Sequence, residues 1–205
     1  MLSDRGPKIL YSKVTSDPAA EPITTTEAKL DLKIDTTDED DLLTIFIQAA
    51  REAVENRTGR SLITQTRVIK MDYFPMDDTI RLPNGPVISV THVKYYDETD
   101  TLVTLSTDDY WVDTDSDIAR IVVENYWPAI YDKPNAVVIT YSAGYGPLKT
   151  DVPAPLRKAI LLILGHLYEN RQAVVVSGSP TGVIEIPMGA EYLMNQYVLE
   201  QDITY

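Results

Sequence analysis

The run Asp113-Thr114-Asp115-Ser116-Asp117, with Glu124 at the twelfth position, has the spacing of a metal-binding loop. Carboxylates at the first, third, fifth and twelfth positions match the oxygen ligands of a calcium-binding EF-hand. The sixth position, where such loops use glycine, is Ile118, which is poorly suited to a left-handed backbone. Residues 119–123 resemble a strand, whereas a calcium loop leads into a helix. We therefore interpret the run as a hairpin turn, with calcium binding as the alternative.

Other side chains with catalytic potential lack the neighbours that catalysis requires. General acid–base catalysis needs one carboxyl with a raised pKa, but the paired carboxylates lie at a helix start or in turns, where both stay ionised: 38–41, 77–78 and 108–109. His92 is expected on an exposed strand face and His166 beside the apolar stripe of a helix. The sequence contains no cysteine, nucleophile elbow or phosphate-binding loop. We predict no enzyme, cofactor or metal; a small hydrolytic domain using the carboxylates of the 113–124 run is the alternative.

The charge of the chain argues against nucleic-acid binding as its main activity. Its 31 acidic and 18 basic residues give a net charge of -13, which repels phosphates on average. Residues 172–205 contain no Lys or Arg, so this tail is expected to bind a neutral or basic protein surface. No run approaches the roughly 18 apolar residues that cross a bilayer, and residues 1–13 do not resemble a signal peptide. We expect a soluble protein made in the cytoplasm.

Helical signals lie in the first part of the sequence. Thr24 followed by Glu27 is a capping box and predicts a short helix through Leu32. Four acidic residues then begin a helix over 38–58, because they complement the positive end of its dipole. The predicted apolar face of this helix comprises Leu42, Ile45, Phe46, Ala49, Ala53 and Val54.

The last part of the sequence predicts two more helices. Pro155 suits the first turn of a helix over 155–171, which we expect to pack on the helix at 38–58. After a loop, a final helix over 188–200 presents Leu193, Met194, Tyr197 and Val198. Between these helical ends, short β-branched and aromatic runs separated by turn residues predict an antiparallel meander or small barrel.

These elements predict an α+β fold: a helical scaffold (helices near 38–58, 155–171 and 188–200) with an antiparallel β-rich insertion. The expected parts are an N-terminal arm at 1–22, the scaffold at 23–60 and 151–173, the insertion at 61–150, and a C-terminal loop, helix and tail at 174–205. The 13 Tyr against two Phe favour protein–protein contacts, because Tyr is enriched at interfaces.

An ordered set of motifs carries a resemblance to a known family. They are Pro22-Ile23-Thr24, Glu27-Ala28-Lys29, Asp38-Glu39-Asp40-Asp41, Ala49-Ala50-Arg51-Glu52, Thr58-Gly59-Arg60, Ile63-Thr64-Gln65-Thr66, Leu82-Pro83, Pro86-Val87, Ala143-Gly144-Tyr145-Gly146, Val152-Pro153-Ala154-Pro155 and Tyr168-Glu169-Asn170-Arg171. Their order and spacing over 22–171 resemble the head–tail connector (adaptor, or head-completion) proteins of long-tailed bacteriophages and gene transfer agents.

The resemblance implies a structural virion protein in the neck between head and tail. Such proteins form a ring, usually a dodecamer, that binds the portal and a tail-side connector or stopper protein, and DNA passes through the channel without sequence-specific binding. The segment that docks into the portal corresponds here to 188–205, and its deletion is expected to leave the fold intact. The expected portal-binding residues are Tyr192, Leu193, Gln196, Tyr197, Ile203 and Tyr205. Another tail-region structural protein, such as a tail terminator, is the alternative.

Overall fold

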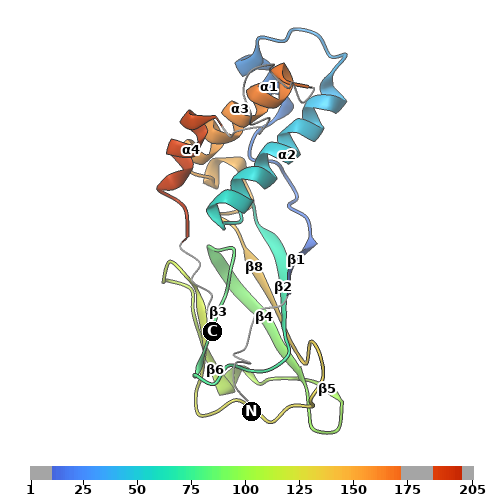
Figure 1. The fold of residues 1–205 in the computed structure, drawn as a ribbon, viewed down its shortest axis with the longest axis vertical. Coiled ribbons are helices and arrows are strands. Elements are labelled where there is room, and N and C mark those ends of the chain that lie inside the picture. Colours follow the sequence, from blue (N-terminus) through green and yellow to red (C-terminus); the bar gives the residue numbers. More distant parts are fainter. Residues whose placement is uncertain (1–10, 172–186, 200–205) are drawn as a thin grey trace, which may run out of the picture. The chain divides into compact units, whose positions relative to one another are not determined.

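The computed structural model describes residues 11–171 and 187–199. They form two compact units, each built from separate stretches of chain (Figure 1). The β unit contains residues 11–19 and 59–145, and the helical unit contains 20–58, 146–171 and 187–198. The sequence-based boundaries at 61 and 150 differ from these by a few residues, and the described part of the predicted arm is divided between the two units.

The helical unit consists of α1 (Thr25–Leu32), α2 (Asp40–Thr58), α3 (Ala154–Glu169) and α4 (Met188–Asn195), with a short 3-10 turn at Lys149–Asp151. The α1 capping box forms as predicted, because Glu27 N donates to Thr24 Oγ1 at 3.2 Å and Thr24 N donates to Glu27 Oε2 at 2.9 Å. Helix α3 packs against α1, α2 and α4, so the predicted contact between the two long helices is confirmed. Helix α4 ends earlier than the predicted 188–200.

The buried face of α2 differs from the predicted one. Its buried residues are Leu43, Ile47, Ala50, Arg51, Val54, Glu55 and Thr58. Of the predicted face only Val54 is buried, and Ile45 is 62% exposed. The apolar residues of α2 fit two adjacent stripes of helical period, and the stripe at 43, 47, 50 and 54 is the one that enters the core. A buried Arg51–Glu55 ion pair completes this face, which is why apolar periodicity alone missed it.

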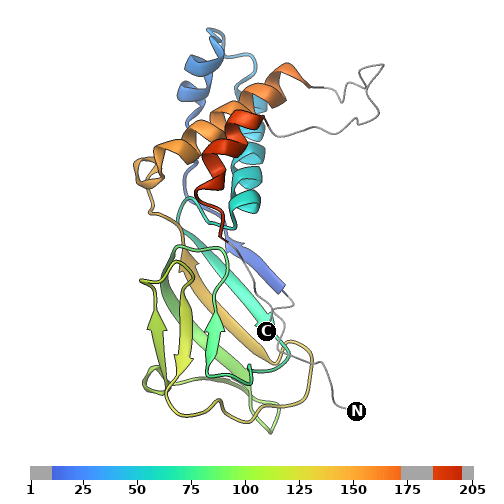
Figure 2. The same cartoon turned by 60° about the vertical axis from the view of Figure 1, so that its left-hand side comes forward.

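The β unit consists of two antiparallel sheets that share one core (Figures 1 and 2). The first has the strand order β1-β2-β8-β4-β5, and the second has the order β3-β7-β6. The strands are β1 (Tyr11–Ser16), β2 (Gln65–Met71), β3 (Thr79–Arg81), β4 (Val87–Tyr96), β5 (Leu102–Thr104), β6 (Tyr110–Asp113), β7 (Arg120–Val123) and β8 (Val137–Ala143). The antiparallel β-rich insertion and the α+β class are confirmed. The arrangement is neither a meander nor a closed barrel, because β8 inserts between β2 and β4.

Strand β1 is a correction to the predicted irregular arm. Residues 11–16 pair with β2 in the register Ser12↔Ile69 and Lys13↔Val68. The segment is an edge strand of the sheet, and edge strands tolerate polar side chains on both faces. This explains why its Ser- and Lys-containing sequence shows no alternating apolar pattern.

Candidate partner-binding surfaces

Helix α4 is held on the helical unit by an apolar face and a polar clamp. Ala190 and Met194 are fully buried, and an ideal Cβ on Gly189 would lie 3.5 Å from Leu162 Cδ1, in ordinary contact. Arg57 Nη2 on α2 donates to Asn195 Oδ1 at 3.1 Å and to Glu191 Oε1 at 3.4 Å. The helix is therefore part of the core of this unit, and its remaining face is free to present side chains.

The outward face of α4 presents two large apolar side chains one helical turn apart. Met188 is 86% exposed and Tyr192 is 79% exposed, and their i, i+4 spacing places them on the same side of the helix. Of the other predicted portal-binding residues, Leu193 and Tyr197 are half-buried and Gln196 is exposed. Ile203 and Tyr205 lie outside the described residues. Met188 is not among the predicted residues, because its exposure depends on how α4 packs against α3.

The packing of α4 argues against the expectation that deleting 188–205 leaves the fold intact. Removing α4 would take Ala190 and Met194 out of the core and expose their apolar neighbours on α3. Losing a buried Met side chain alone costs about 2–5 kcal/mol. A truncation intended to test partner binding must therefore retain α4.

A mostly apolar groove of about 530 Å³ opens on the helical unit. Ile23 and Ile47 form part of its floor, and Leu148, which is 61% exposed, lies at its rim. The remaining lining residues are Ala20, Glu21, Thr24, Thr25, Thr44, Pro147, Lys149 and Thr150. Among these described residues the ionisable groups are Lys149 and Glu21, and the rest of the lining is apolar or carries a hydroxyl group.

Glu27 ties the start of α1 to α3 and to the 3-10 turn. Its Oε1 accepts from Arg157 Nη2 at 2.7 Å and lies 3.0 Å from Lys149 Nζ. Partial burial acts to raise the pKa of this carboxyl, but the hydrogen bond from the Thr24 N–H and the hydrogen bond and charge of Lys149 outweigh burial and lower the pKa to about 2. Glu27 is thus ionised at neutral pH, where its carboxylate holds α1, α3 and the 3-10 turn together.

The 113–124 run forms a hairpin turn, as predicted. Asp113 Oδ1 accepts from the backbone N–H of Asp115 at 3.1 Å, and Asp113 Oδ2 accepts from Ser116 Oγ at 2.8 Å and from Arg120 Nε at 2.9 Å. The hydrogen bond from Ser116 acts most strongly in lowering the pKa of Asp113. Asp113 would be the first ligand of a calcium loop, but both of its carboxylate oxygens are used by hydrogen bonds within the turn and by an ion pair with Arg120 on β7.

The remaining predicted polar residues do not converge. His92 is half-buried and not exposed as predicted; burial, and then the charge of Lys94, lower its pKa. His166 lies near the end of α3, with its ring Nδ1 3.3 Å from Asn170 Nδ2. Within 11–171 and 187–199, no three His, Asp or Glu residues are placed to hold a metal ion, and no helix is long and apolar enough to cross a membrane.

Comparisons with known proteins give both a sequence and a fold relationship. Residues 22–114 match a family described as phage gp6-like head-tail connector protein. A comparison with curated proteins finds no match.

Three solved structures share the fold over nearly the whole chain. One is described as the neck of an empty GTA particle computed with C6 symmetry, and another as the virion of a native gene transfer agent (GTA) particle. Each is 21% identical, with a TM-score of 0.78, and covers 96% of this chain and 99% of the other. The third, the neck of a native GTA particle computed with C12 symmetry, has 20% identity and a TM-score of 0.70, covering 94% and 98%.

Proposed function

We propose that this chain, a member of the phage head–tail connector family over residues 22–114, is a structural subunit of the connector ring in the neck of a virion. The family match carries this proposal. It is supported by the fold shared with chains of gene-transfer-agent necks over more than nine-tenths of both lengths. The subunit is made in the host cytoplasm, assembles with copies of itself into a ring of six-fold or twelve-fold symmetry, and acts without catalysis.

The portal protein is the proposed partner of α4. The exposed Met188 and Tyr192 supply a compact apolar patch on a helix that the core fixes in place. Large amphipathic side chains on a preorganised element are typical centres of binding energy. Leu193, Gln196 and Tyr197 flank this patch, and Ile203 and Tyr205 extend the proposed site in sequence. Because residues 172–205 contain no Lys or Arg, the complementary portal surface is neutral or basic.

DNA is proposed to pass through the ring without sequence-specific binding. A net charge of -13 per subunit, multiplied around a ring, gives a channel that repels phosphates on average. A tail-side connector or stopper protein binds the opposite end of the ring. The turn that Asp113 closes through hydrogen bonds favours neither calcium binding nor hydrolysis as an alternative.

The test is reconstitution of the purified full-length chain with the purified portal protein of the same particle. Negative-stain microscopy is expected to show a ring seated coaxially on the portal, and mass photometry is expected to give an integral number of subunits per portal. A truncation after Leu199, which retains α4, separates the tail from the helix: reduced binding assigns part of the contact to 200–205. Absence of any complex with either protein in excess would contradict the proposal.

A further inference from the structure

The five-stranded sheet of the β unit contains no acidic residue in any of its strands. The strand sequences are YSKVTS, QTRVIKM, VISVTHVKYY, LVT and VVITYSA. In a chain with 31 acidic residues among 205, this leaves one sheet on which every charged side chain is basic. The faces of that sheet therefore differ in charge from the rest of the molecule.

The strand register assigns Lys13, Lys70 and Lys94 to the outward face, whereas Arg67 lies on the inward face and is buried. Ile69, Ile139 and Val93 are paired across three strands and are fully buried, so the neighbouring register rows point away from the core. One such row is Lys13–Val68–Thr140–His92, and the next contains Lys70, Val138 and Lys94. Hydroxyl side chains of Thr66 and Ser142 form a third row. The outward face thus consists of Lys, His, Thr, Ser and Val side chains, and we call it the basic face.

Two carboxylates on the loops beside these strands accept hydrogen bonds within the β unit. Asp72 Oδ1 accepts from the backbone N–H of Asn135 at 2.7 Å, and Asp132 Oδ1 accepts from Tyr73 Oη at 2.6 Å. Lys133 pairs with Asp100 and lies 3.1 Å from the centroid of the Tyr96 ring. Lys133 is thus paired with Asp100, whereas Lys13 and Lys94 add positive charge to the basic face.

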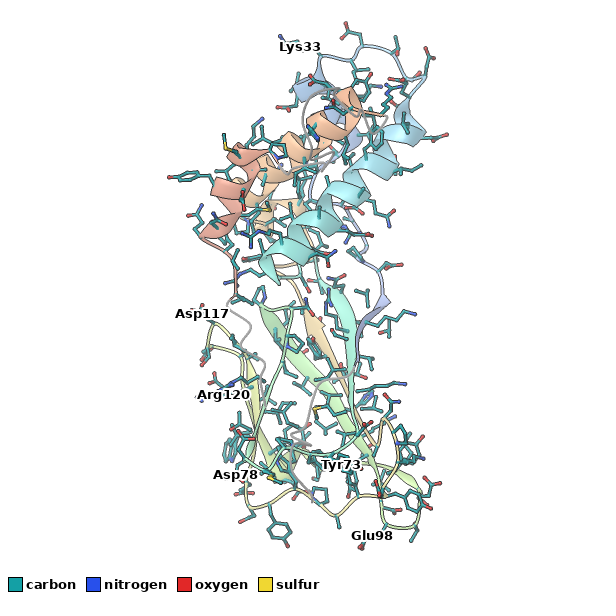
Figure 3. The ribbon with its side chains drawn as sticks, in the orientation of Figure 1. Lys33, Tyr73, Asp78, Glu98, Asp117 and Arg120 are labelled. Atoms are coloured by element: carbon teal, nitrogen blue, oxygen red, sulfur yellow. The ribbon has the colours of Figure 1, made fainter. Side chains whose placement is uncertain are left out.

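The three-stranded sheet on the other side of the same core has the opposite charge. Carboxylates surround its strand ends: Asp77, Asp78, Asp108, Asp109, Asp113, Asp115, Asp117 and Glu124. The basic residues in its strands are Arg81 and Arg120, and Arg120 is paired with Asp113 at 2.9 Å. Asp78, Asp117 and Arg120 lie along this sheet in Figure 3. We call this surface the acidic face.

The acidic face also has an apolar centre. Trp111 on the edge strand β6 is 68% exposed and is paired with Val122 on β7. A large aromatic side chain surrounded by charged residues has the composition of an interface centre with a polar rim. On the basic face, Val68 and Val138 occupy the corresponding middle positions between the lysines.

We propose that the basic face of one subunit packs against the acidic face of the next copy in the ring. This inference rests on the proposed function, because a closed ring requires head-to-tail contacts between two different surfaces of identical subunits. The two faces lie on opposite sides of one core, and they are complementary in charge and each apolar at the centre. Complementary charge steers association and fixes register, while the apolar centres supply contact area.

Duplex DNA is the other polyanion that a basic face attracts, but the charge balance disfavours it. Binding to DNA gains strength from phosphates neutralised by a net excess of cations. Here the three lysines belong to a subunit whose net charge is -13. A second copy of the chain offers an acidic surface without bringing a phosphate backbone close to the remaining carboxylates.

Two charge-reversal variants test the pairing of faces. K13E/K94E reverses the basic face, and D115K/D117K reverses the acidic face at a turn whose hydrogen bonds run through Asp113. Lys33→Glu/Lys158→Glu, in the helical unit, is the charge-matched control for the first variant. Circular dichroism spectra identical to wild type establish that each protein is folded. Assembly is measured by mass photometry and negative-stain microscopy, alone and on the portal, at about 50 mM salt, where screening is weak.

Each reversed variant alone is expected to need at least a tenfold higher concentration for half-maximal assembly than wild type. A one-to-one mixture of the two variants is expected to restore assembly, because the reversed face of each variant is complementary in charge to the reversed face of the other. Such contacts form when the two variants alternate around a ring with an even number of subunits. The control assembles like wild type. Raising the salt to about 500 mM reduces the differences, since surface charges are then screened.

Several results would overturn the inference. Normal assembly of both reversed variants would show that the ring forms without contacts between these two faces. Equal loss of assembly in the Lys33→Glu/Lys158→Glu control, or no rescue on mixing, would mean that the variants act through the net charge of the subunit and not through these faces. Loss of duplex-DNA binding in K13E/K94E with unchanged assembly would make the basic face a nucleic-acid surface. Failure of the wild type to assemble, alone and on the portal, would refute the ring itself and thereby the proposed function.

Discussion

Arg51 and Glu55 form an ion pair inside the helical unit, where Arg51 Nη1 donates to Glu55 Oε2 at 2.8 Å and both side chains are 7% exposed. Arg51 Nε also donates to Glu21 Oε2 at 2.9 Å. Burial acts first to raise the pKa of Glu21, and Arg51 opposes it. One guanidinium therefore joins the segment before α1 to the buried face of α2.

Replacing Arg51 with Met is expected to destabilise the protein by about 3–5 kcal/mol, because it leaves Glu55 buried without its cation. Urea unfolding followed by circular dichroism measures this change. The control is Glu52→Gln on the same helix: Glu52 is 3.6 Å from Arg51 Nη2 and half exposed, so its loss is expected to cost less than about 1 kcal/mol. Equal effects of the two substitutions would contradict the importance of the buried pair.

Glu27 should make stability depend on pH in the acid range. The folded protein lowers its pKa to about 2 from the ordinary value of 4.5, so the unfolded chain takes up the proton first as the pH falls. The stabilisation by Glu27 is therefore fully present above about pH 5 and is lost progressively toward pH 2. With the side chain 30% exposed, we expect a contribution reduced by solvent screening to about 1–2 kcal/mol.

The measurement is urea unfolding of wild type and Glu27→Gln between pH 6 and pH 2.5. Gln keeps the shape of the capping box, so the difference isolates the charge. The free energy of unfolding of the two proteins should differ at pH 6 and converge at the acid end. A difference that stays constant with pH would mean that the charge of Glu27 does not stabilise the fold.

Two methionines of α4 provide a matched test of its two faces. Met194→Ala is expected to destabilise by about 2–5 kcal/mol because the side chain is fully buried. Met188→Ala is expected to change stability by less than about 0.5 kcal/mol because the side chain is 86% exposed. Thermal unfolding of both variants under identical conditions tells them apart, and similar melting temperatures would contradict the packing of α4 on the core.

Tyr192 should matter for binding and not for folding. Tyr192→Ala is expected to weaken binding to the portal by about tenfold or more, corresponding to roughly 1–2 kcal/mol at an interface centre, with an unchanged melting temperature. Tyr126→Ala is the control, because Tyr126 lies on the β unit and is similarly exposed, at 81%. Biolayer interferometry on immobilised portal measures both, and equal affinities for the two variants would exclude Tyr192 from the contact.

Gly144 is expected to be irreplaceable in the β unit. Its φ is 140°, and a Cβ there would lie 2.6 Å from Ile63 C and Thr64 N. Gly144→Ala should therefore destabilise by on the order of 3 kcal/mol or more, since backbone atoms have to move. Gly165→Ala in α3 is the control: its Cβ would meet Leu32 Cδ2 at 3.7 Å, and loss of a helical glycine stabilises by up to about 1 kcal/mol. Urea unfolding compares the two.

The long helices could be predicted because their periodicity and end signals agree, whereas the buried face of α2 could not. Ile45 belongs to an apolar stripe as regular as that of Leu43 and Ile47, and only the position of α3 selects between the stripes. Burial of Arg51 with Glu55 also contradicts the usual assignment of charged residues to the surface. Tertiary contacts decide which stripe of α2 is buried and whether Arg51 and Glu55 are buried with it, and the local sequence pattern carries no information about those contacts.

The strands were predicted where apolar alternation is strong and missed where it is weak. Strand β1 lies at an edge, and β3 and β5 have three residues each. Tyr192, which was predicted to bind the portal, is exposed, whereas Met194, which the final helix was predicted to present, is buried. The basic face was not foreseen, because its lysines come from strands far apart in sequence and meet only through the register of the sheet.

The division of the helical unit into stretches before and after the β unit has a consequence for synthesis on the ribosome. The buried face of α2 is completed by α3, which ends 111 residues after Thr58, from Thr58 to Glu169. At about 5–20 residues per second, that interval is on the order of ten seconds. During this time the β unit can fold on the emerging chain while Leu43 and Ile47 still face water. The inserted β unit can therefore fold before the helical unit is complete, and the apolar face of α2 stays in contact with water during that interval.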